Sequence, residues 1–252
     1  MARAVVGGAT AAAVALGGNL GGVTSFLLSL DGGVLAGRLK LDVLVPVRGL
    51  KRCVDAQNGF EFQYPANWLG DQTLVQRAAQ RAERERALDL PALRGDEAAA
   101  AARRRGALDP VVAFGPAGST GEENVSVIAG PIAPGFTLES LGTPDEAALR
   151  FLNTTAAPPG SGFTGTLLSS SQRRDEAGVL YYQFEFTIEK DPPNPFLRHN
   201  VSVLAARDDV LLSLNAQCPQ ARWERDGPQL AAAAATFRLT RKPPARRRRQ
   251  PY

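Results

Sequence analysis

The sequence predicts an α/β fold in which helices pack on a central, mostly antiparallel sheet. Three observations support this prediction: an aromatic strand directly after the Asn58-Gly59 turn, a strong helix-start signal at Thr143, and alternating segments with short connections between Leu167 and Leu214. Of the 252 residues, 44% are hydrophobic, which is enough for a sizeable core.

The first strand is predicted over residues 60–64, where aromatic and polar side chains alternate with the period of a strand. Pro65 lacks the N–H that a sheet ladder needs, so the strand is expected to end there. Asn67 can cap a helix start, and a helix is predicted over residues 68–88. Upstream, the alternation in residues 39–45 predicts a short edge strand.

Two short strands are predicted next, over residues 111–114 and 124–128, and a helix follows them. Thr143 can cap this helix, Pro144 suits its first position, and Glu146 completes a capping box. These signals predict a helix that begins at Pro144.

The second half of the chain predicts a run of strands and one last helix. The strands are expected at Leu167–Leu168, Val179–Ile188, His199–Ala206 and Val210–Leu214, and the helix at Gln220–Phe237. The short connections between neighbouring strands favour antiparallel hairpins.

The chain is predicted to have three parts: an apolar leader (1–51), one domain (52–239) and a basic, disordered tail (240–252). Within the domain, a low-complexity stretch at about 95–109 is predicted to be a flexible insertion. Residues 4–16 of the leader are small, apolar and uncharged, which is typical of the apolar part of a targeting signal. The alternative is a loosely packed helix that stays on the protein.

Composition narrows the classes of function. The formal net charge is +4, and much of it lies in the Arg246–Arg249 run of the tail, so no nucleic-acid partner is predicted. Two cysteines and one histidine exclude a multi-cysteine zinc module. Cys53 and Cys218 could form a disulfide in an oxidising compartment or stay as two separate buried thiols, and their spacing does not decide between these.

The sequence offers little catalytic chemistry. His199 is the only histidine, and no serine lies in a Gly-x-Ser-x-Gly motif, so no catalytic residue is predicted. The stretch Gly115–Gly121 lacks a following Gly-Lys-Ser/Thr, which argues against a P-loop, and no cofactor is predicted. His199 could join Glu185 or Asp208 in a weak divalent-metal site. The residues alone therefore favour a non-enzymatic binding or assembly role.

An ordered set of motifs resembles the PsbP family. The motifs are Asn58–Trp68 (NGFEFQYPANW), Asn124–Ile128 (NVSVI), Thr143–Ala148 (TPDEAA), Arg198–Val203 (RHNVSV), Leu212–Gln217 (LSLNAQ) and the last helix, Trp223–Phe237. The resemblance spans about Arg52 to Leu239. Within the family, the chain is most similar to the thylakoid lumenal 19 kDa protein group, on Gly18–Asp31, Phe114–Pro116 and Gly118–Glu122.

The resemblance implies an α-β-α sandwich, which Mog1-like proteins share. It implies a monomer in the chloroplast thylakoid lumen, held at the membrane through protein partners. The expected role is that of a non-enzymatic accessory or assembly factor of photosystem II and its oxygen-evolving complex, or of another thylakoid complex. The PsbP subunit itself helps to retain calcium and chloride there, through an N-terminal region that this sequence does not match. Some family members bind a divalent metal through a histidine in the penultimate strand, where His199 lies.

Two other functions stay open. A Mog1-like regulatory module would bind a protein such as a small GTPase, which the shared sandwich suggests and the leader argues against. A lumenal protein or enzyme that takes a small ligand or metal would use a pocket on the sheet, with His199 as its obvious reactive group.

Overall fold

The computed structural model describes residues 19, 22–72, 74, 110–118 and 121–240. These residues fall into two compact units, one that precedes Trp68 and includes Thr240, and one that spans Trp68–Leu239. The predicted insertion at 95–109, the first 18 residues of the leader and residues 241–252 of the tail lie outside the described residues.

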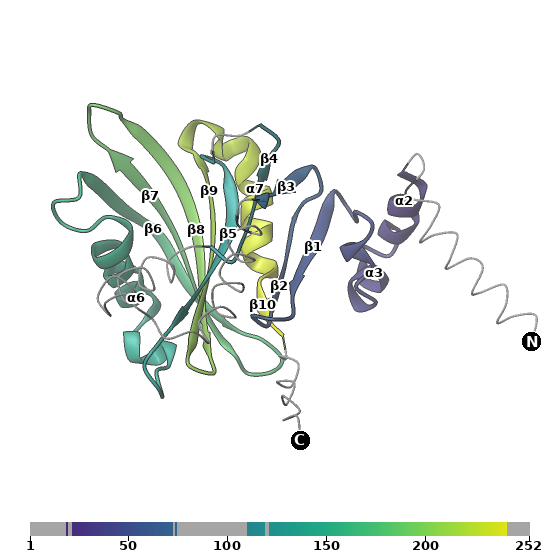
Figure 1. Ribbon diagram of the computed structural model, residues 1–252, viewed down its shortest axis with the longest axis horizontal. Coiled ribbons are helices and arrows are strands. Elements are labelled where there is room, and N and C mark those ends of the chain that lie inside the picture. The colour runs from purple at the N-terminus through teal and green to yellow at the C-terminus, as the bar shows by residue number, and fades with distance from the viewer. Residues whose placement is uncertain (1–18, 20–21, 73, 75–109, 119–120, 241–252) are drawn as a thin grey trace, which may run out of the picture. The chain divides into compact units, whose positions relative to one another are not determined.

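The larger unit is built on a seven-stranded sheet, and every strand pairing in it is antiparallel (Figure 1). The strand order is β3-β4-β5-β9-β8-β7-β6. The strands are β3 (Trp68–Gly70), β4 (Val112–Pro116), β5 (Asn124–Pro131), β6 (Phe163–Arg174), β7 (Leu180–Lys190), β8 (Phe196–Arg207) and β9 (Val210–Pro219), followed in the chain by the short strand β10 (Arg238–Leu239). The mostly antiparallel sheet expected from the sequence is confirmed.

Helices cover both faces of this sheet (Figure 1). The first is α6 (Pro144–Phe151), which is flanked by the short helices η3 (Leu138–Leu141) and η4 (Leu152–Ala156). The second is α7 (Trp223–Thr236), which follows η5 (Gln220–Arg222). α6 packs against β6 and β7, whereas α7 packs against β8 and β9. The result is the expected α-β-α sandwich.

Alternation along β7 shows why the two helices lie on opposite faces. The even-numbered residues of β7 from Leu180 to Ile188 join Ala147, Ala148 and Leu152 in one buried cluster, so they face α6. His199 pairs with the odd-numbered Thr187 and stacks on Trp223 at the start of α7. Successive side chains of a strand point to opposite faces, so the sheet carries one helix on each side.

The predicted capping box of α6 is confirmed. The Thr143 hydroxyl accepts a hydrogen bond from the N–H of Glu146, and the Glu146 carboxylate accepts one from the N–H of Thr143 at 2.7 Å. That backbone hydrogen bond lowers the pKa of Glu146. The helix therefore begins where its capping signal and Pro144 place it.

The helix predicted from residue 68 begins instead as strand β3. Trp68 pairs with Pro116, and Gly70 pairs with Phe114, so the backbone finds its partners in β4. This sheet pairing overrides the local signal at Asn67, which precedes a strand and not a helix. Apart from residues 71, 72 and 74, the rest of the predicted helix lies outside the described residues.

The smaller unit contains two short helices and a hairpin. Its elements are α2 (Val23–Ser29), α3 (Val34–Arg38), η2 (Leu41–Val43), β1 (Leu50–Asp55) and β2 (Phe60–Pro65). β1 and β2 pair antiparallel, with Cys53 opposite Phe62. The strand predicted at residues 60–64 is confirmed, whereas its partner β1 was absent from the predictions.

Residues 39–45, predicted as an edge strand, form the end of the α3 region and the 3-10 helix η2. The N–H of Leu39 bonds to the carbonyl of Leu35, and Lys40 takes a left-handed φ of 53°, so the backbone turns where an extended strand was expected. Leu39 and Leu44 are largely exposed, so the apolar alternation does not mark a buried sheet face.

A buried ionic network holds the smaller unit together. The Arg52 guanidinium donates to Asp42 at 2.8 Å and to Glu61 at 2.9 Å, and Lys40 donates to the second oxygen of Glu61 at 2.7 Å. Glu61, expected on the polar face of its strand, is fully buried because these cations bind it. Burial raises the pKa of Asp42, but hydrogen bonds from Arg52 and Gln63 outweigh it and hold that pKa below its usual value.

Removal of the central cation should destabilise this unit. We expect Arg52→Met to cost about 3–5 kcal/mol, because Asp42 loses its cation and Glu61 keeps only Lys40, which is partly exposed. Hydrogen exchange of the β1 and β2 amides measures the local free energy of opening. The control is Lys51→Met, which removes a neighbouring cation that forms no ion pair among the described residues. Equal protection in the two variants would contradict the role assigned to Arg52.

Candidate functional site

His199 lies on β8 and is almost fully buried. Its Nε2 is 2.8 Å from a carboxylate oxygen of Glu185 on β7, and its Nδ1 is 2.9 Å from the side-chain oxygen of Gln220. The imidazole stacks on Trp223, with ring centroids 3.5 Å apart and planes 7° apart. Both ring nitrogens are therefore engaged, and the cluster joins the start of α7 to the sheet.

Only one of the two carboxylates expected near His199 is placed beside it. Glu185 is in contact, whereas Asp208 lies in the β8–β9 turn and approaches Arg207 at 3.6 Å. Among the residues that the structure describes, no group of three or more His, Cys, Asp or Glu side chains could hold a metal ion. A metal at His199 stays a prediction.

The His199 cluster makes two predictions that one set of variants can test. His199→Phe keeps an aromatic ring against Trp223 but loses two hydrogen bonds. We therefore expect the free energy of unfolding, measured with urea, to fall by about 1–3 kcal/mol, with Arg198→Gln as the control.

The same variant tests the metal prediction. If a metal binds His199, Zn²⁺ or Mn²⁺ should raise the Tm of the unsubstituted protein and leave that of His199→Phe unchanged. Equal Tm shifts in both proteins would rule out a metal at this histidine.

The two cysteines are free thiols in environments that suppress the thiolate. Burial, followed by the nearby Asp55 charge, raises the pKa of Cys53 to about 12. Burial also raises the pKa of Cys218 to about 11, and Glu123 and Asp226 contribute to this rise. Cys218 is opposite His199 on β9 and is fully buried, so neither its exposure nor its charge suits a nucleophile.

Alkylation kinetics test these pKa directions. At about pH 8, iodoacetamide should modify both thiols at least about tenfold more slowly in the folded protein than in urea, where the pKa is ~8.5. The rate in the folded protein should then rise as the pH rises toward 10, because each thiolate is still forming in that range. Mass spectrometry of the two cysteine peptides separates the rates, and folded and unfolded rates that agree at pH 8 would contradict this account.

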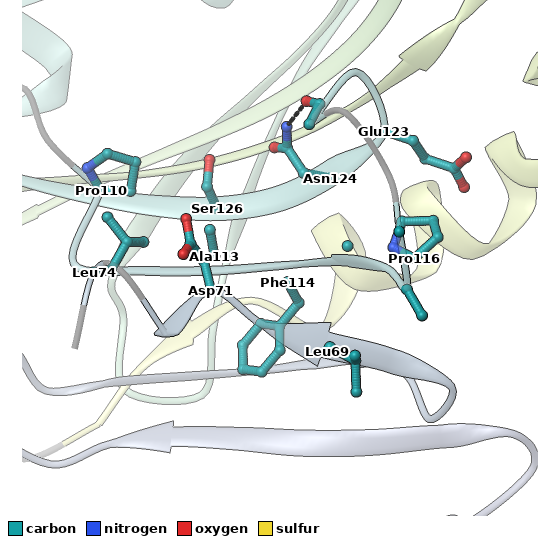
Figure 2. Close-up of a pocket in the computed structure, with 14 residues that line it drawn as sticks. Leu69, Asp71, Leu74, Pro110, Ala113, Phe114, Pro116, Glu123, Asn124 and Ser126 are labelled. Atoms are coloured by element: carbon teal, nitrogen blue, oxygen red, sulfur yellow. Dashed lines mark hydrogen bonds between the residues drawn. The ribbon is translucent and has the colours of Figure 1, made fainter. Parts of the chain in front are cut away.

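A hollow of about 580 Å³ lies on the other face of the sheet, where β3 and β4 meet β5 (Figure 2). Leu69 and Phe114 supply apolar surface, and Asn124 donates a hydrogen bond to the carbonyl of Gly121 at 2.7 Å. Asp71 and Glu123 are the ionisable residues in the described lining. Two acids make this a poor site for phosphate, in agreement with the absence of a P-loop motif.

Glu123 at the rim of the hollow is a paired, buried acid. Its carboxylate accepts a hydrogen bond from Arg222 at 2.8 Å and is almost fully covered. Burial raises the pKa of Glu123, Asp226 adds to this rise, and Arg222 and Arg225 oppose it. The pair connects the start of β5 to η5, which is a structural role.

A groove of about 390 Å³ continues from the hollow, and the two share Asn124 and Ser126. Six polar residues form its floor in two rows across β5, β9 and β8, and we call them the polar strip: Asn124, Gln217 and Asn200 in one row, and Ser126, Asn215 and Ser202 in the other. Each row continues into a phenylalanine of β7, Phe186 or Phe184. The polar strip is thus the part of the α6 face that lies beyond the apolar cluster.

Aromatic and polar side chains line the described part of the groove. Phenylalanines form one wall, and Arg198 lies over the ring of Phe196 at 4.2 Å. Ser202 donates to Asn215 at 2.8 Å, so its hydroxyl serves the strip itself. The described lining of the groove contains no histidine, cysteine or carboxylate to activate a nucleophile. This surface was not predicted from the sequence. Polar residues alternate on three of the predicted strands, and this pattern could have indicated a polar face.

Residues 48–239 match the family model for PsbP. The chain belongs to the PsbP family. It is 45% identical to PsbP domain-containing protein 7, chloroplastic, from Arabidopsis thaliana, over 94% of this chain and 82% of that protein. It is also 28% identical to CyanoP from Thermosynechococcus vestitus, over 75% of this chain and 85% of that protein.

The fold has a solved counterpart. The solution structure of CyanoP from Synechocystis sp. PCC 6803 superposes with a TM-score of 0.52 at 22% identity, over 77% of this chain and 95% of that one. The PsbP-type fold expected from the motifs is confirmed. Within the described part of the chain, no helix has the length and apolar character needed to span a bilayer.

Proposed function

We propose that this protein is a non-enzymatic accessory or assembly factor of photosystem II that works in the chloroplast thylakoid lumen. The match to the PsbP family over residues 48–239 is the observation that carries this proposal. The relative from Arabidopsis thaliana named chloroplastic supports the organelle, and the CyanoP relatives support a photosynthetic setting.

The polar strip is the surface that we assign to the partner. Its half-buried amides, those of Asn124, Asn215 and Gln217, lie between an aromatic wall and the hollow at β3, which suits a polypeptide segment that needs both hydrogen bonds and apolar contact. The side-chain oxygen of Gln217 accepts no hydrogen bond within the described residues, and Gln217 is only half-buried, so this oxygen is available to a partner. Arg198 at the edge supplies a cation for a carboxylate.

The role proposed here needs neither a cofactor nor a metal bound by this chain. Calcium and chloride at the oxygen-evolving complex would be affected through the partner, in keeping with an accessory role. A small lumenal ligand is the second candidate function, and the groove with its single arginine is the observation that favours it.

Affinity purification of the tagged full chain from solubilised thylakoids tests the proposal. We expect mass spectrometry to recover photosystem II subunits or assembly intermediates. Arg198→Glu should lower that recovery about tenfold, because it reverses a charge beside the polar strip. The matched control is Leu197→Glu, the same substitution on the next residue of β8, whose side chain is on the opposite face.

Three results would overturn the proposal. They are the absence of photosystem subunits from the purification, recovery of a small GTPase in their place, or fractionation of the mature protein into the stroma. If Arg198→Glu and Leu197→Glu lower the recovery equally, the assignment of the polar strip to the partner is contradicted. The proposed role at photosystem II is not affected by that result.

A further inference from the structure

The two helices of the smaller unit expose an unusual amount of apolar side chain. Eight large hydrophobic residues in the span 23–44 are each more than half exposed, and we call them the apolar helix patch: Val23, Phe26, Leu27, Leu30, Val34, Leu35, Leu39 and Leu44. Scattered exposed hydrophobic residues are normal on a protein surface, but this concentration of them in one short segment is typical of a contact surface.

Small residues, charged groups and the buried Val47 lie beneath the patch. The side of α3 that faces inward carries Ala36, which is fully buried, and Gly37, whose missing Cβ would lie 3.6 Å from the guanidinium of Arg52. The interior here holds the ionic network of Arg52, Asp42 and Glu61, whereas the large apolar side chains point outward. Such an arrangement leaves apolar surface in water unless an apolar phase covers it.

Local hydrogen bonds hold the patch in one conformation. Asp31 accepts from the N–H groups of Gly33 and Leu35, which fixes the turn between α2 and α3. Ser29 accepts from the N–H of Arg48 at 3.3 Å, which joins α2 to the segment before β1. The exposed side chains are therefore presented by an ordered surface, so binding costs little conformational entropy.

The charges around the patch are mostly positive. Arg38 and Arg48 are exposed, and Lys51 is half-buried, and none of the three has a carboxylate partner among the described residues. Lys40 binds Glu61 but keeps close to half of its side chain exposed. The one exposed acid of this segment, Asp31, is occupied by the turn. The patch thus combines apolar side chains with a basic rim.

We propose that the apolar helix patch binds directly to the surface of an anionic lipid bilayer. Phe26, Leu27 and Leu30 would enter the boundary between headgroups and acyl chains, and Arg38 and Arg48 would contact the anionic headgroups. The basic rim favours an anionic bilayer over an uncharged apolar groove of another protein, which would leave these cations without partners. It also argues against a second copy of this chain, because the two basic rims would repel each other. This inference is independent of the proposed photosystem partner, and it applies to the chain that keeps residues 23–44.

Co-sedimentation of the full chain with lipid vesicles tests the inference. The probes are vesicles of phosphatidylcholine alone and vesicles in which about a third of the lipid is phosphatidylglycerol. We expect binding to the anionic vesicles, weaker binding to the neutral ones, and a further loss in high salt. The double variant Phe26→Ser/Leu30→Ser should reduce binding to anionic vesicles about tenfold or more. Arg38→Gln/Arg48→Gln should remove most of the preference for anionic lipid.

Leu168→Ser is the matched control, because Leu168 is about half exposed on β6 in the other unit, and it should bind vesicles like the unsubstituted chain. Circular dichroism of each variant checks that the fold is kept. Absence of binding to anionic vesicles, or a double variant that binds as well as the unsubstituted chain, would overturn the inference. Self-association that the double variant abolishes, in the absence of vesicle binding, would assign the patch to a second copy and also overturn it.

Discussion

The register between β8 and β9 determines what each face of the larger unit can do. Val201 pairs with Ala216 on the α7 face, and the intervening Ser202 pairs with Asn215 on the α6 face. Because side chains alternate with a period of two, a slip by one residue would bury the polar strip under α7 and expose the apolar residues. His199 reinforces the register by joining β8 to β7 and to η5 through its two nitrogens.

Local signals predicted the larger unit well and the smaller unit poorly. The strands of the second half and the start of α6 follow from alternation and from the Thr143–Glu146 capping box, which are short-range effects. The start of β3 and the helical turn at residues 39–45 depend on partners far along the chain, or on a backbone conformation that no residue pattern reveals. The polar strip was missed for a related reason, since it exists only when three strands are aligned.

The two units place charge and apolar surface in opposite ways. In the larger unit, the core under α6 is apolar and the groove on the same face has a polar floor. In the smaller unit, an arginine and two carboxylates are buried, and the apolar side chains are exposed on two short helices. Buried ion pairs seldom add net stability over apolar residues, so folding stability alone does not explain this arrangement. A PsbP-family protein with both surfaces could hold a protein partner and a membrane at once.

The central claim is that the polar strip contacts photosystem II, and photo-crosslinking tests it most directly. A photoreactive amino acid in place of Arg198 would be irradiated in isolated thylakoids, and the same residue in place of Leu197 reports on the opposite face of β8. The account expects crosslinks to a photosystem II subunit from position 198 and none from position 197. Crosslinks from position 197 alone, or from neither position, would contradict it.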